Sequence, residues 1–156
     1  MKSDLRFKIH PKVRFGEKNN KMKKILVGFD GSEGSEQALN RAMMLLDEYA
    51  ELIILAVIPS PEDKAFVDDE MYKKMKKKAE NLINDIIEDI GHHEFTISGI
   101  VEEGDPAALI IDVSNRKNVD LIVLGSKGTS ELGQYLIGSV ANKVVQYAHK
   151  PVMVVR

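Results

Sequence analysis

The stretch LVGFDGSEGS, residues 26–35, joins an apolar run to a cluster of glycines and serines. Its first half belongs to KILVGF, residues 24–29, whose branched apolar side chains are typical of a buried strand. Its second half leads into residues 35–49, which carry apolar side chains at helical spacing: Ala38, Leu39, Ala42, Leu45 and Leu46. The sequence therefore predicts a strand, a glycine-rich turn and a helix in succession.

The same succession continues along the chain. Further strands are predicted at residues 51–58, 95–101, 120–124 and 152–155, and further helices at residues 71–90 and from 139 to about 148. A third helix begins at Asp105 and Pro106, since aspartate can cap a helix and proline suits its first position. Strands that alternate with helices predict an α/β fold: a five-stranded, parallel, doubly wound (Rossmann-like) sheet with helices on both faces.

Length and composition fit one globular domain of 156 residues, with 44% hydrophobic and 29% charged residues. The absence of cysteine excludes disulfides, thiolate metal sites and cysteine nucleophiles. No apolar run reaches the roughly 18 residues of a membrane span, and charges stand where a secretory signal has its apolar segment. We therefore expect a cytoplasmic protein, with neither a membrane nor a specific nucleic acid as partner.

Charge divides the chain into a basic extension, residues 1–21, and an acidic domain, residues 22–156. The extension carries a net charge of +5, which leaves −7 for the domain within the total of −2. In the extension Leu5, Phe7 and Ile9 alternate with basic residues, as Val13 and Phe15 do after Pro11. Three interpretations stay open: a strand added to a sheet edge, a basic arm for an acidic partner, or translation that starts naturally at Met22.

The first glycine-rich loop is a poor phosphate site. Gly28, Gly31 and Gly34 match neither the dinucleotide fingerprint nor the P-loop pattern. Asp30, Glu33 and Glu36 crowd the start of the following helix. Carboxylates there satisfy the positive end of the helix and repel a phosphate.

The second loop, GSKGTSELGQYLIGS at residues 125–139, has the opposite character. Gly125 and Gly128 bracket Ser126 and Lys127 after a strand, and Gly138 leads into the last helix. No carboxylate lies in the first turn of that helix, residues 139–142, so its amides stay available for an anion. The sequence therefore predicts the phosphate site here, with a flexible turn as the plainer alternative.

These residues resemble the ATP-binding branch of the universal stress protein family. The resemblance covers roughly residues 22–156 and rests on the Gly-x-x-Gly, nine-residue spacer and Gly-Ser pattern of residues 125–139, together with ILVGFDGSEGS, GDPA and KPVMVV. It implies the strand order 3-2-1-4-5, with the ends of the first and fourth strands side by side.

The resemblance also implies roles for nine residues, which a tenth, Lys127, joins by its position in the loop. Gly28 and Asp30 would border the adenine or ribose, Asp30 also being a candidate cap of the first helix, and Val57 would pack on the base. Gly125, Ser126 and Gly128 would meet the ribose and phosphates. The phosphate tail would lie on the backbone amides and hydroxyl of the next residues: Gly138, Ser139 and Val140. Lys127 is the nearest cation.

One departure concerns the charge that balances a triphosphate. Relatives often carry Arg or Lys in the nine-residue spacer, whereas TSELGQYLI here holds Glu131 and no base. The balance must then come from Lys127 and a divalent metal, Mg²⁺ or Mn²⁺, held mainly by the phosphates.

The predicted function is a nucleotide-dependent regulatory or sensor module that binds ATP and changes its unknown protein partner with occupancy. Two alternatives stay open: a slow or partner-stimulated ATPase, and a structural interaction dimer that binds no nucleotide. The resemblance also predicts a homodimer through the last strand, residues 152–155, which is an apolar sheet edge.

Two other features have plain interpretations. His92 and His93 adjoin Glu94 in a predicted turn, but no third ligand at useful spacing supports a metal site. The lysine run at residues 73–78 fits the solvated face of an amphipathic helix better than an anion site.

Overall fold

The protein is described here by a computed structural model that covers residues 22–58, 60, 68–126 and 137–156. The basic extension at residues 1–21 and two predicted site residues, Lys127 and Gly128, lie outside the described residues.

Strands and helices alternate along the whole described chain. Their bounds are β1 Met22–Gly28, α1 Glu33–Leu45, β2 Leu46–Ile58, α2 Asp69–Ile90, β3 Thr96–Glu103, α3 Pro106–Arg116, β4 Leu121–Gly125, α4 Ser139–Tyr147 and β5 Val152–Val155. The strands form one sheet in the order β3-β2-β1-β4-β5, and every neighbouring pair is parallel. The predicted fold class and strand order are confirmed.

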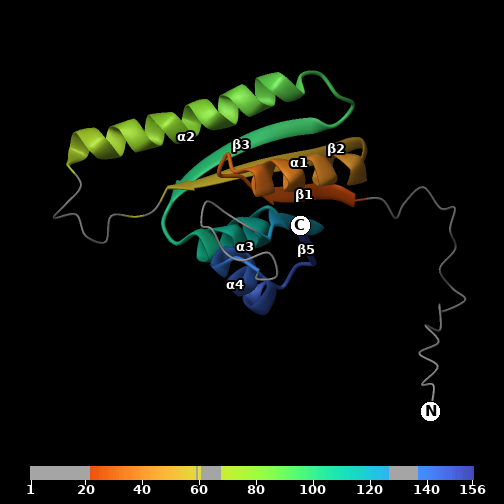
Figure 1. Ribbon diagram of the computed structural model, residues 1–156. Coiled ribbons are helices and arrows are strands. Elements are labelled where there is room, and N and C mark those ends of the chain that lie inside the picture. Colours follow the sequence, from red (N-terminus) through yellow and green to blue (C-terminus); the bar gives the residue numbers. More distant parts are fainter. Residues whose placement is uncertain (1–21, 59, 61–67, 127–136) are drawn as a thin grey trace, which may run out of the picture.

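The sheet lies between two layers of helices, α1 and α2 on one face and α3 and α4 on the other (Figure 1). Successive side chains of the central strand β1 pack against the two helix layers in turn. Ile25 and Val27 pack in the cluster under α1 and α2, and Leu26 packs in the cluster under α3 and α4. All three side chains are fully buried, which is why the central strands read as continuous apolar runs.

The boundary between the first helix and the second strand differs from the prediction. The helix ends at Leu45 rather than at residue 49, and β2 begins at Leu46 rather than at residue 51. Leu46 pairs with Met22 of β1, and Tyr49, at φ 64°, donates its amide to the Glu94 carbonyl. Pairing between distant segments thus overrides a helical pattern that continues past Leu45.

The remaining elements shift by at most two residues at either end from their predicted bounds. The predicted start of the third helix is also confirmed: the Asp105 carboxylate accepts the Ala108 amide at 2.9 Å, and Pro106 occupies the first turn. None of the helices within the described ranges combines the length and the apolar character that spanning a membrane requires.

Candidate functional site

The centre of the sheet places two strand ends, and the loops that follow them, side by side. β1 pairs with β4, and the chain leads from β1 back to β2 but from β4 outward to β5. Open α/β sheets bind ligands at such a reversal, outside the carboxyl ends of the strands. The loop after β1 leads into α1 and the loop after β4 leads into α4, so the amino ends of both helices lie at this edge.

The amino end of α1 is closed by its own side chains. Ser32 is the cap, and its hydroxyl accepts the Ser35 amide at 3.3 Å. The Asp30 carboxylate accepts the Ser32 amide at 3.0 Å and the Ser32 hydroxyl proton. Glu33 and Glu36 add two carboxylates in the first turn. The prediction that this end repels anions therefore agrees with the structure.

One detail of this prediction is wrong, because Asp30 does not cap the helix. Asp30 lies two residues before the cap, where its carboxylate closes a turn onto Ser32 and fixes that residue in place. Both residue types favour the cap position, so the sequence alone did not separate them.

The amino end of α4 is open. Its cap position is Gly138, no side chain caps it, and its first turn contains no acidic residue, as predicted. The amides of Ser139, Val140 and Ala141 donate to no acceptor within the described part of the chain. Three donors and the positive end of the helix dipole are thus directed at one place.

The Gly138 amide, which the sequence assigned to the phosphate tail, is already engaged. It donates to the Ser126 carbonyl at 2.6 Å, and the Ser126 amide in turn donates to the Val155 carbonyl at 2.7 Å. An amide at a cap position lies before the helical turn and here faces back to the strand end. The free donors therefore begin at Ser139, and Gly138 contributes by holding the start of α4 against the end of β4.

Two glycines bring the end of β4 close to the backbone of the first turn of α1. A Cβ placed on Gly125 would lie 2.6 Å from both the carbonyl carbon and the oxygen of Gly34, in the first turn of α1. No side chain fits in that space. Gly28, at the end of β1, has a different neighbour: its Cβ would lie 2.7 Å from Leu124 Cδ2.

The remaining predicted residues flank the same edge on the α3 and α4 side of the sheet. Val57, next to last in β2, and Val140, in the first turn of α4, both pack half-buried against the cluster under these helices. Ser126 is buried, at 6% exposure. The structure thus gathers eight of the ten predicted residues at this edge, and Lys127 and Gly128 lie outside the described residues.

The edge also carries a carboxylate that the sequence reasoning missed. Glu103 ends β3 and accepts hydrogen bonds from the Tyr72 hydroxyl and, at 3.4 Å, from the Ser60 hydroxyl. The hydrogen bond to Glu103, followed by partial burial, raises the pKa of the Tyr72 phenol above its ordinary value. The position of Glu103 at a strand end, directly before Gly104 and Asp105, was the available signal.

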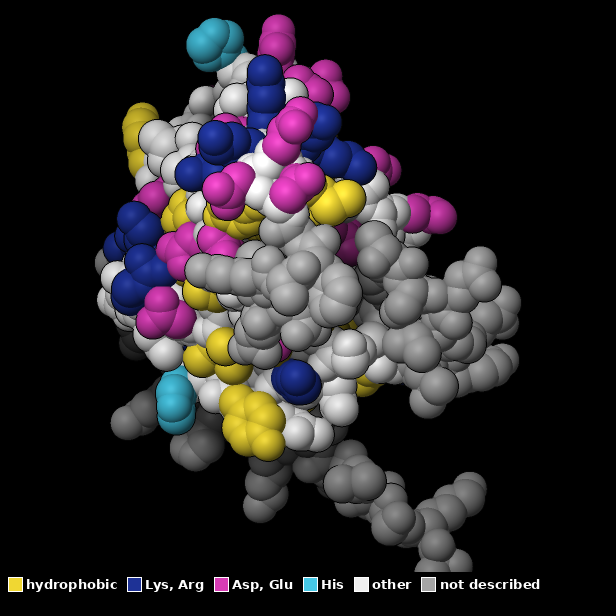
Figure 2. Space-filling model, turned by 90° about the vertical axis from the view of Figure 1, so that its left-hand side faces the viewer, with side chains coloured by type: hydrophobic (Ala, Val, Ile, Leu, Met, Phe, Trp, Pro, Cys, Tyr) yellow, Lys and Arg dark blue, Asp and Glu magenta, His cyan; other side chains and the backbone are white. Residues whose placement is uncertain are grey.

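Charge at this edge is negative. The described loop residues, 29–32, 60, 68, 104–105, 126 and 137–138, include aspartates but neither lysine nor arginine. Figure 2 looks onto this end of the molecule and shows acidic side chains there, interspersed with lysine and arginine side chains. An anion bound here is therefore held by amides and hydroxyls, and it needs a cation from another source.

His92 and His93 lie at the opposite edge of the sheet, where the strands begin. His93 Nε2 is 2.8 Å from the Ile90 carbonyl, and its ring stacks on Phe95. No group of three or more side chains suited to a metal ion occurs in the described part of the chain.

Comparison with known proteins agrees with the fold. The universal stress protein family model matches residues 21–156. Universal stress protein YxiE of Bacillus subtilis is 34% identical over an alignment of 145 positions, and the match covers 85% of this chain and 98% of the relative. The solved structure of protein MJ0577 of Methanocaldococcus jannaschii has a TM-score of 0.75 at 34% identity and covers 85% of this chain and 94% of its own.

A universal stress protein of Archaeoglobus fulgidus, solved in complex with dAMP, has a TM-score of 0.58 at 21% identity and covers 85% of this chain and 97% of its own. At that identity the likeness is one of fold. The family model and the relatives at 34% identity extend over nearly all of the described elements. The chain belongs to the universal stress protein family.

Proposed function

We propose that this protein binds ATP at the carboxyl edge of the sheet and acts in the cytoplasm as a nucleotide-dependent regulatory module of the stress response. The open amino end of α4 carries the proposal. Three amides that have no acceptor among the described residues, and a helix dipole with no acidic residue in the first turn, meet there, beside an α1 end that carries carboxylates. Such an end is suited to a phosphate group.

The triphosphate would lie on the Ser139 and Val140 amides and the Ser139 hydroxyl, with the Ser126 hydroxyl beside it. The adenine and ribose would lie toward Gly28, Asp30 and Val57, at the ends of β1 and β2. Gly125 and Gly128 keep the roles near ribose and phosphates that the resemblance implies, and Lys127 stays the nearest cation. The dAMP complex of the Archaeoglobus fulgidus relative supports a nucleotide in this fold.

A divalent metal, Mg²⁺ or Mn²⁺, would accompany the triphosphate. The described edge is acidic, and the Asp30 carboxylate is engaged by Ser32. A metal held mainly by phosphate oxygens, together with Lys127, supplies the missing positive charge without a dedicated cage of protein ligands. We expect chelation of the metal by EDTA to weaken ATP binding.

Titration calorimetry with MgATP tests the proposal. We expect Ser139→Glu to lower the affinity about 100-fold, because a carboxylate at the first helical position opposes the phosphates and like-charge contacts cost several kcal/mol. Ser139 is exposed, so the glutamate has room. Ser139→Ala is the matched control, and it removes only the hydroxyl. Equal MgATP binding by wild type and Ser139→Glu, or none by wild type, would contradict the site.

We also infer that two copies pair through β5. This strand pairs only with β4 within the described sheet, and its four residues are apolar and half-buried. An unpaired apolar edge invites a second strand, and two-fold symmetry would make that pairing antiparallel. Sedimentation at micromolar concentration should give a dimer, and a monomer would contradict the inference.

A further inference from the structure

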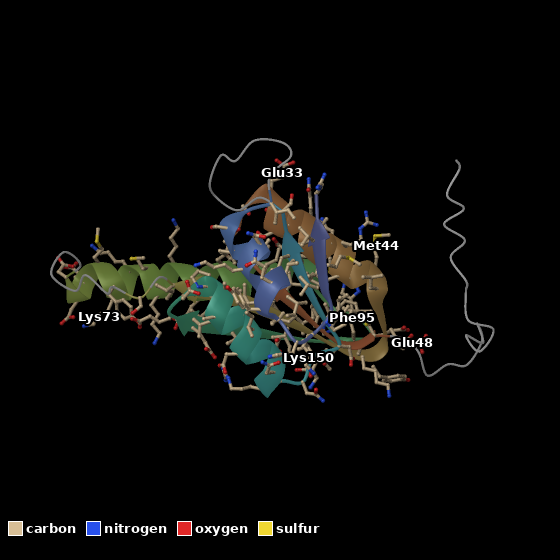
Figure 3. The ribbon with its side chains drawn as sticks, turned by 90° about the horizontal axis from the view of Figure 1, so that it is seen from below. Glu33, Met44, Glu48, Lys73, Phe95 and Lys150 are labelled. Atoms are coloured by element: carbon tan, nitrogen blue, oxygen red, sulfur yellow. The ribbon has the colours of Figure 1, made fainter. Side chains whose placement is uncertain are left out.

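The sheet has a second feature at its other edge, where the strands begin. Residues 46–48, at the start of β2, and residues 92–95, between α2 and β3, line an open hollow of about 520 Å³. We call it the amino-edge hollow. Figure 3 places Glu48 and Phe95 at this end of the molecule and Lys73 of α2 at the opposite end. The hollow is therefore far from the ATP site proposed above and independent of it.

Local geometry holds the two walls of the hollow together. Tyr49, in the left-handed region, donates its amide to the Glu94 carbonyl at 3.1 Å. The His93 ring stacks on Phe95 with 4.8 Å between centroids, and His93 Nε2 lies 2.8 Å from the Ile90 carbonyl. The aromatic surface in the hollow is thus fixed before any ligand arrives.

The hollow combines that aromatic surface with negative charge. Glu48 and Glu94 are exposed at its rim, and Asp47 also lines it. Nearby apolar side chains lie uncovered, with Met44 at 74% and Tyr49 at 91% exposure. Acidic groups around an apolar surface fit a basic segment that carries apolar side chains of its own.

This chain contains such a segment immediately next to the hollow. The described structure begins at Met22, which pairs with Leu46, one of the lining residues. Residues 1–21 precede it, with a net charge of +5 and apolar residues that alternate with basic ones. An extended chain spans about 3.4 Å per residue, so Phe15 can reach about 24 Å from Met22.

We propose that the basic extension, residues 1–21 of the same chain, occupies the amino-edge hollow. Val13 and Phe15 would pack against the His93 and Phe95 rings, and Arg14 and Lys18 would meet Glu48 and Glu94. Covalent attachment favours this occupant over a separate basic peptide, because a short tether gives an effective concentration in the millimolar range.

Spin labelling of the full chain tests this directly, since the chain has no cysteine. A nitroxide on Gly16→Cys, beside Phe15, should broaden the NMR amide signals of residues 46–48 and 92–95 and leave those of Ser126 and Ser139 sharp. A nitroxide on Lys73→Cys is the control, because position 73 lies roughly 26 Å along α2 from Ile90, where the helix ends beside the hollow, at 1.5 Å per residue. Broadening spread evenly, or confined to another surface, would overturn the proposal.

A mixed sample distinguishes the extension of the same chain from that of a second copy. Spin-labelled protein at natural isotope abundance is added to ¹⁵N-labelled protein that carries no nitroxide. Broadening at the hollow that persists in this mixture would assign the hollow to the extension of a second copy and overturn an intramolecular contact. Its absence from the mixture, with broadening in the single-species sample, supports the proposal.

Charge reversal supplies an independent test. Glu48→Lys with Glu94→Lys should abolish the broadening caused by the label at position 16, because the rim then repels the extension. Both side chains are exposed, so the fold should tolerate the change. Glu80→Lys, an exposed position in the middle of α2, is the matched control and should leave the broadening unchanged. Unaltered broadening in the double variant would overturn the charge pairing.

Discussion

The amino ends of α1 and α4 follow neighbouring strands and lie at one edge of the sheet, yet they differ in capping and in charge. Ser32 caps α1, and Glu33 and Glu36 occupy its first turn. Gly138 precedes α4, with no side-chain cap and no acid in the first turn. The fold supplies two helix dipoles at the same edge, and a few side chains decide which one stays open to an anion.

The largest expected effect comes from breaking the contact that holds the two helix ends together. Gly125→Ala would place a Cβ 2.6 Å from the Gly34 backbone, which has no side chain that can turn away. We expect the free energy of unfolding, measured by urea denaturation, to fall by about 1–3 kcal/mol. MgATP binding should weaken as well, because α1 must move away from β4.

Gly28→Ala is the matched control for this variant. Its Cβ would meet Leu124 Cδ2 at 2.7 Å, the far end of a side chain that can adopt another rotamer. Gly28→Ala should therefore lose less stability than Gly125→Ala. The reverse order would show that the Gly34 contact is not the tighter one.

A smaller effect is expected from opening the closed end. Ser32→Ala removes the hydroxyl that accepts the Ser35 amide, and loss of a cap costs about 1 kcal/mol. Ser139→Ala is the comparison, since Ser139 is exposed and caps nothing. Thermal unfolding should show a lower midpoint for Ser32→Ala and almost no shift for Ser139→Ala. Equal shifts would contradict the assignment of Ser32 as the cap.

The smallest effects should have opposite signs at the two ends. Glu33→Gln removes a favourable charge from the start of α1, and Ser139→Glu adds one at the start of α4. Each change alters the free energy of unfolding by about 0.3–1 kcal/mol at low salt. Glu33→Gln should destabilise the nucleotide-free protein and Ser139→Glu should stabilise it, although the latter loses ATP. High salt should reduce both effects. Changes of the same sign would argue against the dipole explanation.

The sequence predicted the fold class well because the pattern of each element is local and strong. The apolar runs at residues 51–58 and 120–124 match central strands that are buried on both faces. The order of the strands came from the family resemblance, since the alternation of strands and helices along the chain is compatible with several strand orders. The end of α1 was missed because Leu46 and Tyr49 continue a helical pattern, and their pairing with Met22 and Glu94 depends on distant segments.

The site was predicted in outline for a similar reason. The absence of carboxylates in the first turn of α4 can be read from residues 139–142 directly. The engagement of the Gly138 amide by Ser126, and the contact between Gly34 and Gly125, could not be read in this way. Both join positions that are not neighbours in the chain, and no spacing in the sequence records such a contact. The roles of the ten predicted residues toward ATP stay predictions until binding is measured.

The hydrogen bond between the Gly138 amide and the Ser126 carbonyl has a consequence for how this chain can vary. It joins the residue after β4 directly to the residue before α4, so the start of the helix is held from the strand end by backbone atoms alone. Every residue type except proline supplies the amide that such a contact needs. Side chains at the start of α4 can therefore change, and with them the preference for one ligand over another, while the helix amides keep their place.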